Sequence, residues 1–353
     1  MYIKKKYSGR TMMRWTRREI RFFIVMATIV TILYDILGFH FLQIPWAALA
    51  LIGTAVAFLI GFQSNAVYGR IWEARTIWGA IVNDSRMFTI MVKEMITNEY
   101  AQETASENEL KEIKRTIVHR HIAWLTALRH AMRQVKPWES YRLNKRNEEW
   151  LNVLHIPELE ISMEDDLNKH LSEEEYSIVM SKTNKAAAIL TLQSSHIREL
   201  KERGLIWEFS FLEMQSKISE LIGHQGKSER IKNFPYPRQF ATLGYTSINL
   251  FNMLLPFGIV PEFHKLGESL IDKFPIIGDY FVWLAIPFTV LVSWVFNTMQ
   301  RIGTVGENPF EGSSNDVPIS TISRGIEIDI LEMIDTEKEQ IPGPVPADFD
   351  VQM

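Results

Sequence analysis

Three residues at four-residue spacing stand out in an apolar stretch of the sequence, LIGTAVAFLIGFQS at residues 51–64. Thr54, Phe58 and Phe62 fall on one face of a helix, because positions i, i+4 and i+8 follow one another along its axis. Such a face is most often packing or lipid-contact surface. If identical helices surround an axis, the same side chains form stacked rings, and an apolar ring excludes water when narrow and conducts when it widens. We call these three residues the neck stripe.

The neighbours of the neck stripe favour the second interpretation. Small and polar residues lie beside it and make a poor lipid-facing surface: Gly53, Gly61, Ser64 and Asn65.

No combination of residues typical of an enzyme or metal site is found. His119 and His121 are two residues apart and lie on different faces of a helix, and His130 does not complete a ligand set, so ordinary surface or interface histidines are expected. The acidic runs 164–166 and 173–175 are expected to be solvated helix ends. The sequence has no cysteine, which excludes disulfides and thiol chemistry. We therefore predict no enzyme activity, no cofactor, no metal site and no nucleic-acid partner.

The distribution of charge predicts the elements that carry the stripe. Residues 22–69 contain no Lys or Arg and only Asp35 as an acid, and this length fits two crossings of a ~30 Å hydrocarbon core. Residues 239–261 and 274–300 each suit one further crossing. Four crossings, an even number, keep both termini on the same side of the cell (inner) membrane. The basic arm before residue 22 places that side in the cytoplasm: Lys4, Lys5, Lys6, Arg10, Arg14, Arg17, Arg18 and Arg21. We expect a retained anchor rather than a signal peptide, because no small-residue cleavage site follows the first apolar run.

Asp35 lies about 14 residues, or roughly 21 Å along a helix, beyond Arg21. A carboxylate near the outer edge of the membrane usually faces protein or water. Two roles stay open: a structural hydrogen bond, or a place at an outer pore mouth.

The sequence predicts five regions. They are a basic arm (1–21), two membrane helices including the pore helix (22–69), a cytosolic helical region (70–233), two further membrane helices (234–301), and a cytosolic end (302–353) whose proline-rich terminus is extended or disordered. Within 70–233, Ser106 with Glu109 and Ser172 with Glu175 are typical of capping boxes. We expect one helix from Ser172 to a stop at Gly204, and another over residues 206–222. No strand pattern is found.

Four segments resemble the bestrophin family, especially its bacterial members. They are YGRIWEARTIWGAIVNDSRMF (68–88), FPYPRQF (234–240), LLPFGIV (254–260) and ENPFEGSSNDVPI (307–319), in order along most of the chain. The resemblance implies an all-α membrane channel: a homopentamer in which four transmembrane helices per subunit continue into a cytosolic helical bundle.

The resemblance also implies roles for particular residues. The second membrane helix of each subunit lines one axial pore, with Thr54, Phe58 and Phe62 as its neck, and the nearest candidates for a second, cytosolic constriction are Ile189 and Gln193. We interpret the charged residues of the first motif as structural groups at the membrane boundary that pair with one another or with neighbouring subunits: Arg70, Glu73, Arg75, Asp84 and Arg86.

The chain departs from the family pattern at two points. Eukaryotic bestrophins carry a calcium-binding acidic cluster after Asn-Pro-Phe, whereas this chain has EGSSND, with only Glu311 and Asp316 acidic, so calcium gating is not expected. Thr54 stands where the family usually has a branched apolar residue.

Chloride is our first choice among permeant monovalent ions. The alternatives are a sodium-selective channel of the same fold, or a membrane-anchored scaffold without a pore. A secondary transporter is disfavoured because no inverted repeat is visible.

Overall fold

The computed structural model describes residues 1–139, 147 and 153–353, and these residues are almost entirely helical. Among them no strand occurs, and two isolated bridges, Tyr2 to Val351 and Asp348 to Val351, are the only β-type pairings. The prediction of an all-helical protein is confirmed. The chain divides into two compact units, Lys4–Gly69 with Tyr236–Glu307 and Met1–Ile3 with Arg70–Pro235 and Asn308–Met353.

The first of these, which we call the membrane unit, contains the long apolar helices. Three segments are long and apolar enough to cross a membrane: His40–Met95, Arg238–Leu270 and Pro275–Val305. Its elements are α1 (Gly9–Trp15), α2 (Arg17–Thr31), the π-turn η1 (Ile32–Ile36), η2 (His40–Leu42), the first part of α3 (Trp46–Met95), α11 (Arg238–Leu270), α12 (Pro275–Tyr280), η4 (Phe281–Leu284) and α13 (Ala285–Val305).

The fourth expected span stays a prediction. It corresponds to α2 and η1, whose α-helical part has only 15 residues, begins with two arginines and ends in the π-turn. This segment packs on α11 and α13. Val30 and Tyr34 join a core with Val56 and Ile60 of α3 and Phe251 of α11.

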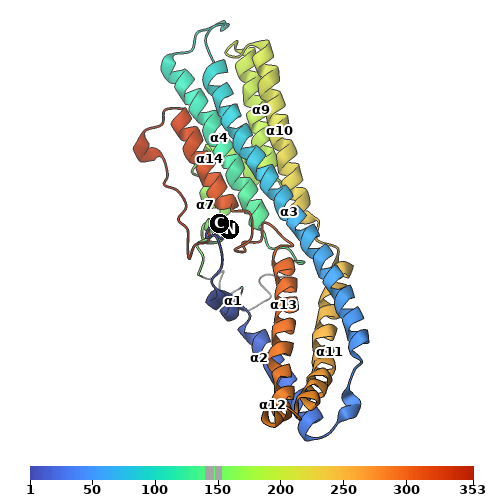
Figure 1. The fold of residues 1–353 in the computed structure, drawn as a ribbon. Coiled ribbons are helices and arrows are strands. Elements are labelled where there is room, and N and C mark those ends of the chain that lie inside the picture. The colour runs from blue at the N-terminus through green and yellow to red at the C-terminus, as the bar shows by residue number, and fades with distance from the viewer. Residues whose placement is uncertain (140–146, 148–152) are drawn as a thin grey trace. The chain divides into compact units, whose positions relative to one another are not determined.

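The second unit, which we call the bundle unit, consists of amphipathic helices around a larger core. Figure 1 shows α4, α9, α10 and α14 lying alongside one another with α3. Trp78, Phe88, Trp124 and Phe310 are fully buried in the core. The elements are residues 70–95 of α3, α4 (Glu107–Arg133), α6 (Pro157–Glu160), α7 (Met163–Leu167), α8 (Glu173–Met180), α9 (Lys185–Glu202), α10 (Glu208–Asn233), α14 (Ile319–Met333) and η5 (Lys338–Gln340).

Local capping residues set the helix boundaries of the bundle unit. The Ser106 hydroxyl accepts from Glu109 N at 3.2 Å, and Ser172 with Glu175 forms a reciprocal capping box, so both predicted starts are confirmed. The prediction of one helix from Ser172 to Gly204 is wrong. The chain leaves the helix after Met180 and starts α9 afresh, because Asn184 caps it by accepting from Ala187 N at 3.0 Å.

The C-terminal ends of α9 and α10 and the end of the chain differ in how far they match the prediction. Gly204 ends α9 with φ of +76°, in the left-handed region that glycine adopts without strain. Helix α10 runs eleven residues beyond the predicted end at residue 222, to Asn233. The proline-rich terminus is extended, and its last residues are packed rather than disordered: Val351 and Met353 are buried, and Met353 O accepts from Thr321 N at 2.5 Å.

Candidate pore neck and its surroundings

The neck stripe is an exposed face of α3 in the subunit. Phe58 is 65% and Phe62 72% exposed, and Thr54 is exposed as well, with its hydroxyl donating to Ala50 O at 2.8 Å. Val56 and Ile60, on the other side of the same helix, are buried in the core of the membrane unit. The two phenylalanine rings are therefore not core residues of the subunit, which excludes packing within one chain as the reason for their spacing.

The charged motif after the neck stripe is bound to other helices of the bundle unit. Arg70 donates to the carbonyl oxygens of Ile231 and Phe234, at 3.1 and 2.9 Å, and Glu73 forms an ion pair with Arg230. The Arg70 guanidinium thus caps carbonyl oxygens at the C-terminal end of α10. Arg70 and Glu73 together fasten α3 to α10.

Two further motif residues, Asp84 and Arg86, also bind other helices of the bundle unit. Asp84 accepts from Lys217 at 3.0 Å and lies 2.7 Å from His224 Nε2, both on α10, and Arg86 pairs with Asp329 of α14 at 2.5 Å. Arg75 is exposed and has no ion pair with a described residue. The expected pairing of motif residues with one another is not found among the described residues. The partners of the other four residues lie on neighbouring helices of the same subunit, and pairing with neighbouring subunits stays a prediction.

The two candidates for a cytosolic constriction are wrong. Ile189 is completely buried in the core of the bundle unit. Gln193 is 1% exposed, accepts from Arg120 Nη1 at 2.8 Å and donates to Ile117 O at 2.8 Å. A pore constriction requires a side chain that is exposed in the single subunit, and both residues lie on the inward face of α9.

Asp35 lies in the π-turn η1 and faces α11. Its carboxylate is 3.9 Å from His264 Nδ1, and His264 Nε2 is 3.6 Å from Glu268. The Tyr34 ring meets the rings of His40 and His264 at centroid distances of 4.6 and 5.5 Å. The contact at 3.9 Å is longer than a hydrogen bond, so it places Asp35 beside His264 of α11 and leaves both roles of Asp35 as predictions.

The histidines of α4 are more buried than the sequence suggested. His121 is buried, with Nε2 2.8 Å from the Ser85 hydroxyl, and burial lowers its pKa to about 3. His130 is buried next to Asp166, whereas His119 is partly exposed and its ring lies 5.8 Å from that of His170, tilted by 31°. The prediction of surface histidines is wrong for His121 and His130. His121 serves as a neutral, hydrogen-bonded core residue.

One acid of the run 164–166, Asp166, is buried in an ion-pair cluster and does not lie on a solvated helix end as expected. Arg129 contacts Glu158 at 2.5 Å and also pairs with Asp166, while Arg133 lies 3.6 Å from Glu158. Burial by itself raises the pKa of Asp166, but the hydrogen bond from His130 and the charge of Arg129 lower it well below its ordinary value. Glu175 also forms an ion pair, with Arg120. The signal in the sequence is a pair of arginines at i and i+4, Arg129 and Arg133, among the apolar residues in the second half of α4.

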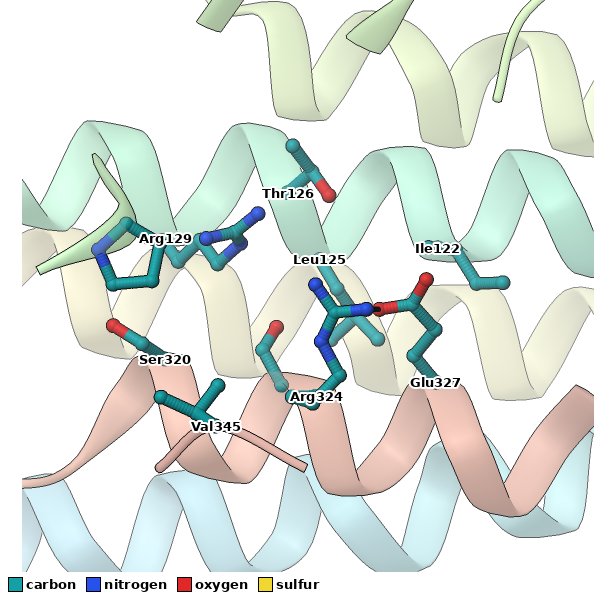
Figure 2. Close-up of a pocket in the computed structure, with 10 residues that line it drawn as sticks. Ile122, Leu125, Thr126, Arg129, Ser320, Arg324, Glu327 and Val345 are labelled. Carbon is teal, nitrogen blue, oxygen red and sulfur yellow. Dashed lines mark ion pairs between the residues drawn. The ribbon is translucent and has the colours of Figure 1, made fainter. Parts of the chain in front are cut away.

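A cavity of about 20 Å³ lies beside this cluster (Figure 2). Thr126 and Arg129 of α4 face Ser320, Arg324 and Glu327 of α14, and Arg324 pairs with Glu327 at 3.1 Å. Burial raises the pKa of Glu327, against the opposing effect of Arg324. The volume suits one water molecule rather than an organic ligand.

The two acidic side chains of the EGSSND loop accept hydrogen bonds from the loop itself and from Asn308. Asp316 accepts from Gly312 N at 2.7 Å, Ser313 N at 2.9 Å and the Ser313 hydroxyl. Glu311 accepts from Asn308 Nδ2 at 3.2 Å. Within the part of the chain that the structure describes, no group of three or more potential metal ligands converges.

Sequence reasoning missed two residues directly behind the neck. Gln63 and Glu307 are buried and hydrogen-bonded to each other at 3.2 Å. The available signal was an amide inside an apolar helix, one position after Phe62, together with a carboxylate at the end of the last apolar segment.

The chain is similar to known proteins over most of its length. The voltage-dependent anion channel-forming protein YneE of Salmonella typhi is 24% identical over 322 residues, covering 91% of this chain and 86% of that protein. The similarly named RSc3414 of Ralstonia nicotianae is 26% identical over 285 residues, covering 81% of this chain and 76% of that protein. The crystal structure of a bacterial bestrophin homologue from Klebsiella pneumoniae superimposes with a TM-score of 0.67 at 22% identity, covering 90% and 98% of the two chains.

The profile of the bacterial and fungal bestrophin proteins matches residues 8–332, which include the neck stripe, the charged motif and the EGSSND loop. The chain therefore belongs to the bestrophin family.

Proposed function

We propose that this protein is an anion channel, with chloride as its first-choice permeant ion, in which five copies surround one axial pore. The observation that carries the proposal is the exposed neck stripe on a 50-residue helix. An apolar face with a threonine, two large rings and small neighbours has no core to enter in its own subunit. Five such faces around an axis would give stacked rings. The names of the relatives, anion channel-forming proteins, support the same reading.

The chemistry of the neck is compatible with anions. The neck stripe carries no charged side chain, and aromatic rings have positive edges, which attract an anion when the edges face the axis. A sodium-selective pore of the same fold is the rival, because an uncharged apolar ring does not by itself fix the sign of the ion.

We propose four crossings per subunit, with both termini in the cytoplasm. The fourth crossing is α2 with η1, which together run from Arg17 to Ile36, roughly 30 Å. Phe22, Val25 and Ile29 on this segment are each more than half exposed, as lipid-facing residues would be.

Flux measurements on reconstituted protein test the proposal. Liposomes loaded with a chloride-quenched dye should report protein-dependent chloride entry that exceeds sodium entry, measured in parallel with a sodium-sensitive dye. Sodium entry without chloride entry would support the rival, and no flux of either ion would support a scaffold without a pore.

A further inference from the structure

Gln63 lies directly behind the neck. It follows Phe62 in α3, yet Phe62 is 72% exposed and Gln63 only 4%. Burying an amide in an apolar helix of this kind costs free energy unless its polar atoms are hydrogen-bonded. Its surroundings therefore explain why a glutamine is tolerated there.

Two glycines from other helices make room for the amide. A Cβ added to Gly244 of α11 would come 3.0 Å from Gln63 Oε1, and one added to Gly303 of α13 would come 3.7 Å from Gln63 Cδ. The side chain thus fills a niche between α11 and α13. A larger residue at position 244 would crowd it.

A buried carboxylate completes the contact. Gln63 Nε2 donates to Glu307 Oε1 at 3.2 Å, and Glu307 is 1% exposed. Arg238 Nη1, at the first residue of α11, lies 3.4 Å from Glu307 Oε2. Hydrogen bonds to an ionised acceptor are stronger than those between neutral groups. The three side chains therefore link α3, the segment after α13 and the start of α11.

We propose that the Gln63–Glu307 hydrogen bond sets the rotation of α3 about its axis and so fixes where Phe62 points. Gln63 is then a positioning residue for the neck, an inference that rests on the proposed function only for its effect on ion flow. Adjacent positions in a helix are about 100° apart, so Phe62 cannot turn about the axis without carrying Gln63 out of its niche. Loss of the bond leaves the part of α3 in the membrane unit held by apolar contacts such as those of Val56 and Ile60, which resist rotation less specifically than a hydrogen bond.

The absence of cysteine from this chain provides a direct test. Phe62→Cys or, as a second reporter on the same face of α3, Thr54→Cys is introduced alone, and the rate of modification by a charged methanethiosulfonate is measured on the oligomer in detergent. Each is then combined with Glu307→Ala, Glu307→Gln or the isosteric Gln63→Met. Gln300→Ala is the matched control, because this buried glutamine of α13 bonds within its own helix, to Thr304 at 3.0 Å.

We expect Glu307→Ala and Gln63→Met each to change the rate at position 62 by about tenfold, the effect of losing one hydrogen bond to a charged group. Glu307→Gln should stay within about twofold of the parent, because its amide oxygen still accepts from Gln63. Gln300→Ala should have no effect at either position, and the rate at position 54 should shift together with the rate at position 62, because both lie on the face of α3 that would rotate. Adding Gln63→Met to Glu307→Ala should change nothing further, because the bond between the two residues is already lost.

Unchanged rates at position 62 in assembled Gln63→Met and Glu307→Ala oligomers would overturn the proposal. So would a Glu307→Gln variant that behaves like Glu307→Ala, because the charge rather than the bond would then matter. Gln63→Met keeps the niche filled and remains informative if Glu307→Ala does not assemble. Since the modification rate requires no current, a protein without ion flux that still shows these differences would refute the channel and leave the positioning role intact.

Discussion

Replacing both neck phenylalanines with alanine separates a pore-lining face from a packing face. Only about a third of each ring is covered within the subunit, since Phe58 is 65% and Phe62 72% exposed. Truncating a fully buried phenylalanine costs about 3–5 kcal/mol, so contacts within the subunit account for roughly 1–2 kcal/mol per ring here. The subunit should therefore fold, and the neck should lose the apolar bulk that excludes water.

The assay has two readouts, the mass of the oligomer in detergent and chloride flux into liposomes. We expect the double variant to keep the oligomer of the parent and to conduct constitutively. Ile60→Ala is the control for packing, because Ile60 is 2% exposed and its truncation should cost about 2–5 kcal/mol without opening the neck. Phe22→Ala with Phe288→Ala is the control for exposed rings on other apolar helices, and should leave flux unchanged. An assembled Phe58/Phe62 variant with parental flux would refute the neck, and failure to assemble would indicate that the rings pack between subunits.

Three further predictions concern assembly, calcium and pH. Native mass spectrometry should give a pentamer, because the exposed stripe on α3 needs equivalent stripes to close around it; a monomer or dimer would remove the pore. Currents should be equal in chelator and in micromolar calcium, since Asp316 already accepts three hydrogen bonds from its own loop; a steep calcium dependence would contradict this. Burial lowers the pKa of His121 to about 3, so the unfolded chain binds a proton first as pH falls below about 6.5, and the folded state should lose roughly 2 kcal/mol from this residue by pH 5. The fall in melting temperature between pH 7 and pH 5 should be smaller for His121→Asn, and an identical fall would show that His121 is not the cause.

The features that could be predicted from the sequence depend on local spacing. The i, i+4, i+8 stripe needs only a helix, and the Ser106 and Ser172 caps need only the residues that follow them. Long apolar runs likewise predict membrane helices from length and charge alone. The exposed face of α3 and the all-helical fold were accessible for this reason.

The remaining features depend on contacts between residues far apart in sequence. Gln63 and Glu307 are separated by 244 positions, and Arg129 meets acids 29 and 37 positions away. Nothing in the local pattern shows which acids of a run point into the core, so the sequence alone does not predict that Asp166 is buried. Position along the chain likewise does not show that Ile189 points inward, because the inward face of α9 is decided by its packing on α4 and α10.

The central claim, that this protein conducts anions through its own pore, is tested most directly by a reversal potential. Purified protein is placed in a planar bilayer that separates two concentrations of potassium chloride, and the voltage of zero current is recorded. We expect protein-dependent current that reverses near the equilibrium potential of chloride. Reversal near the equilibrium potential of potassium, or no protein-dependent current, would contradict the account.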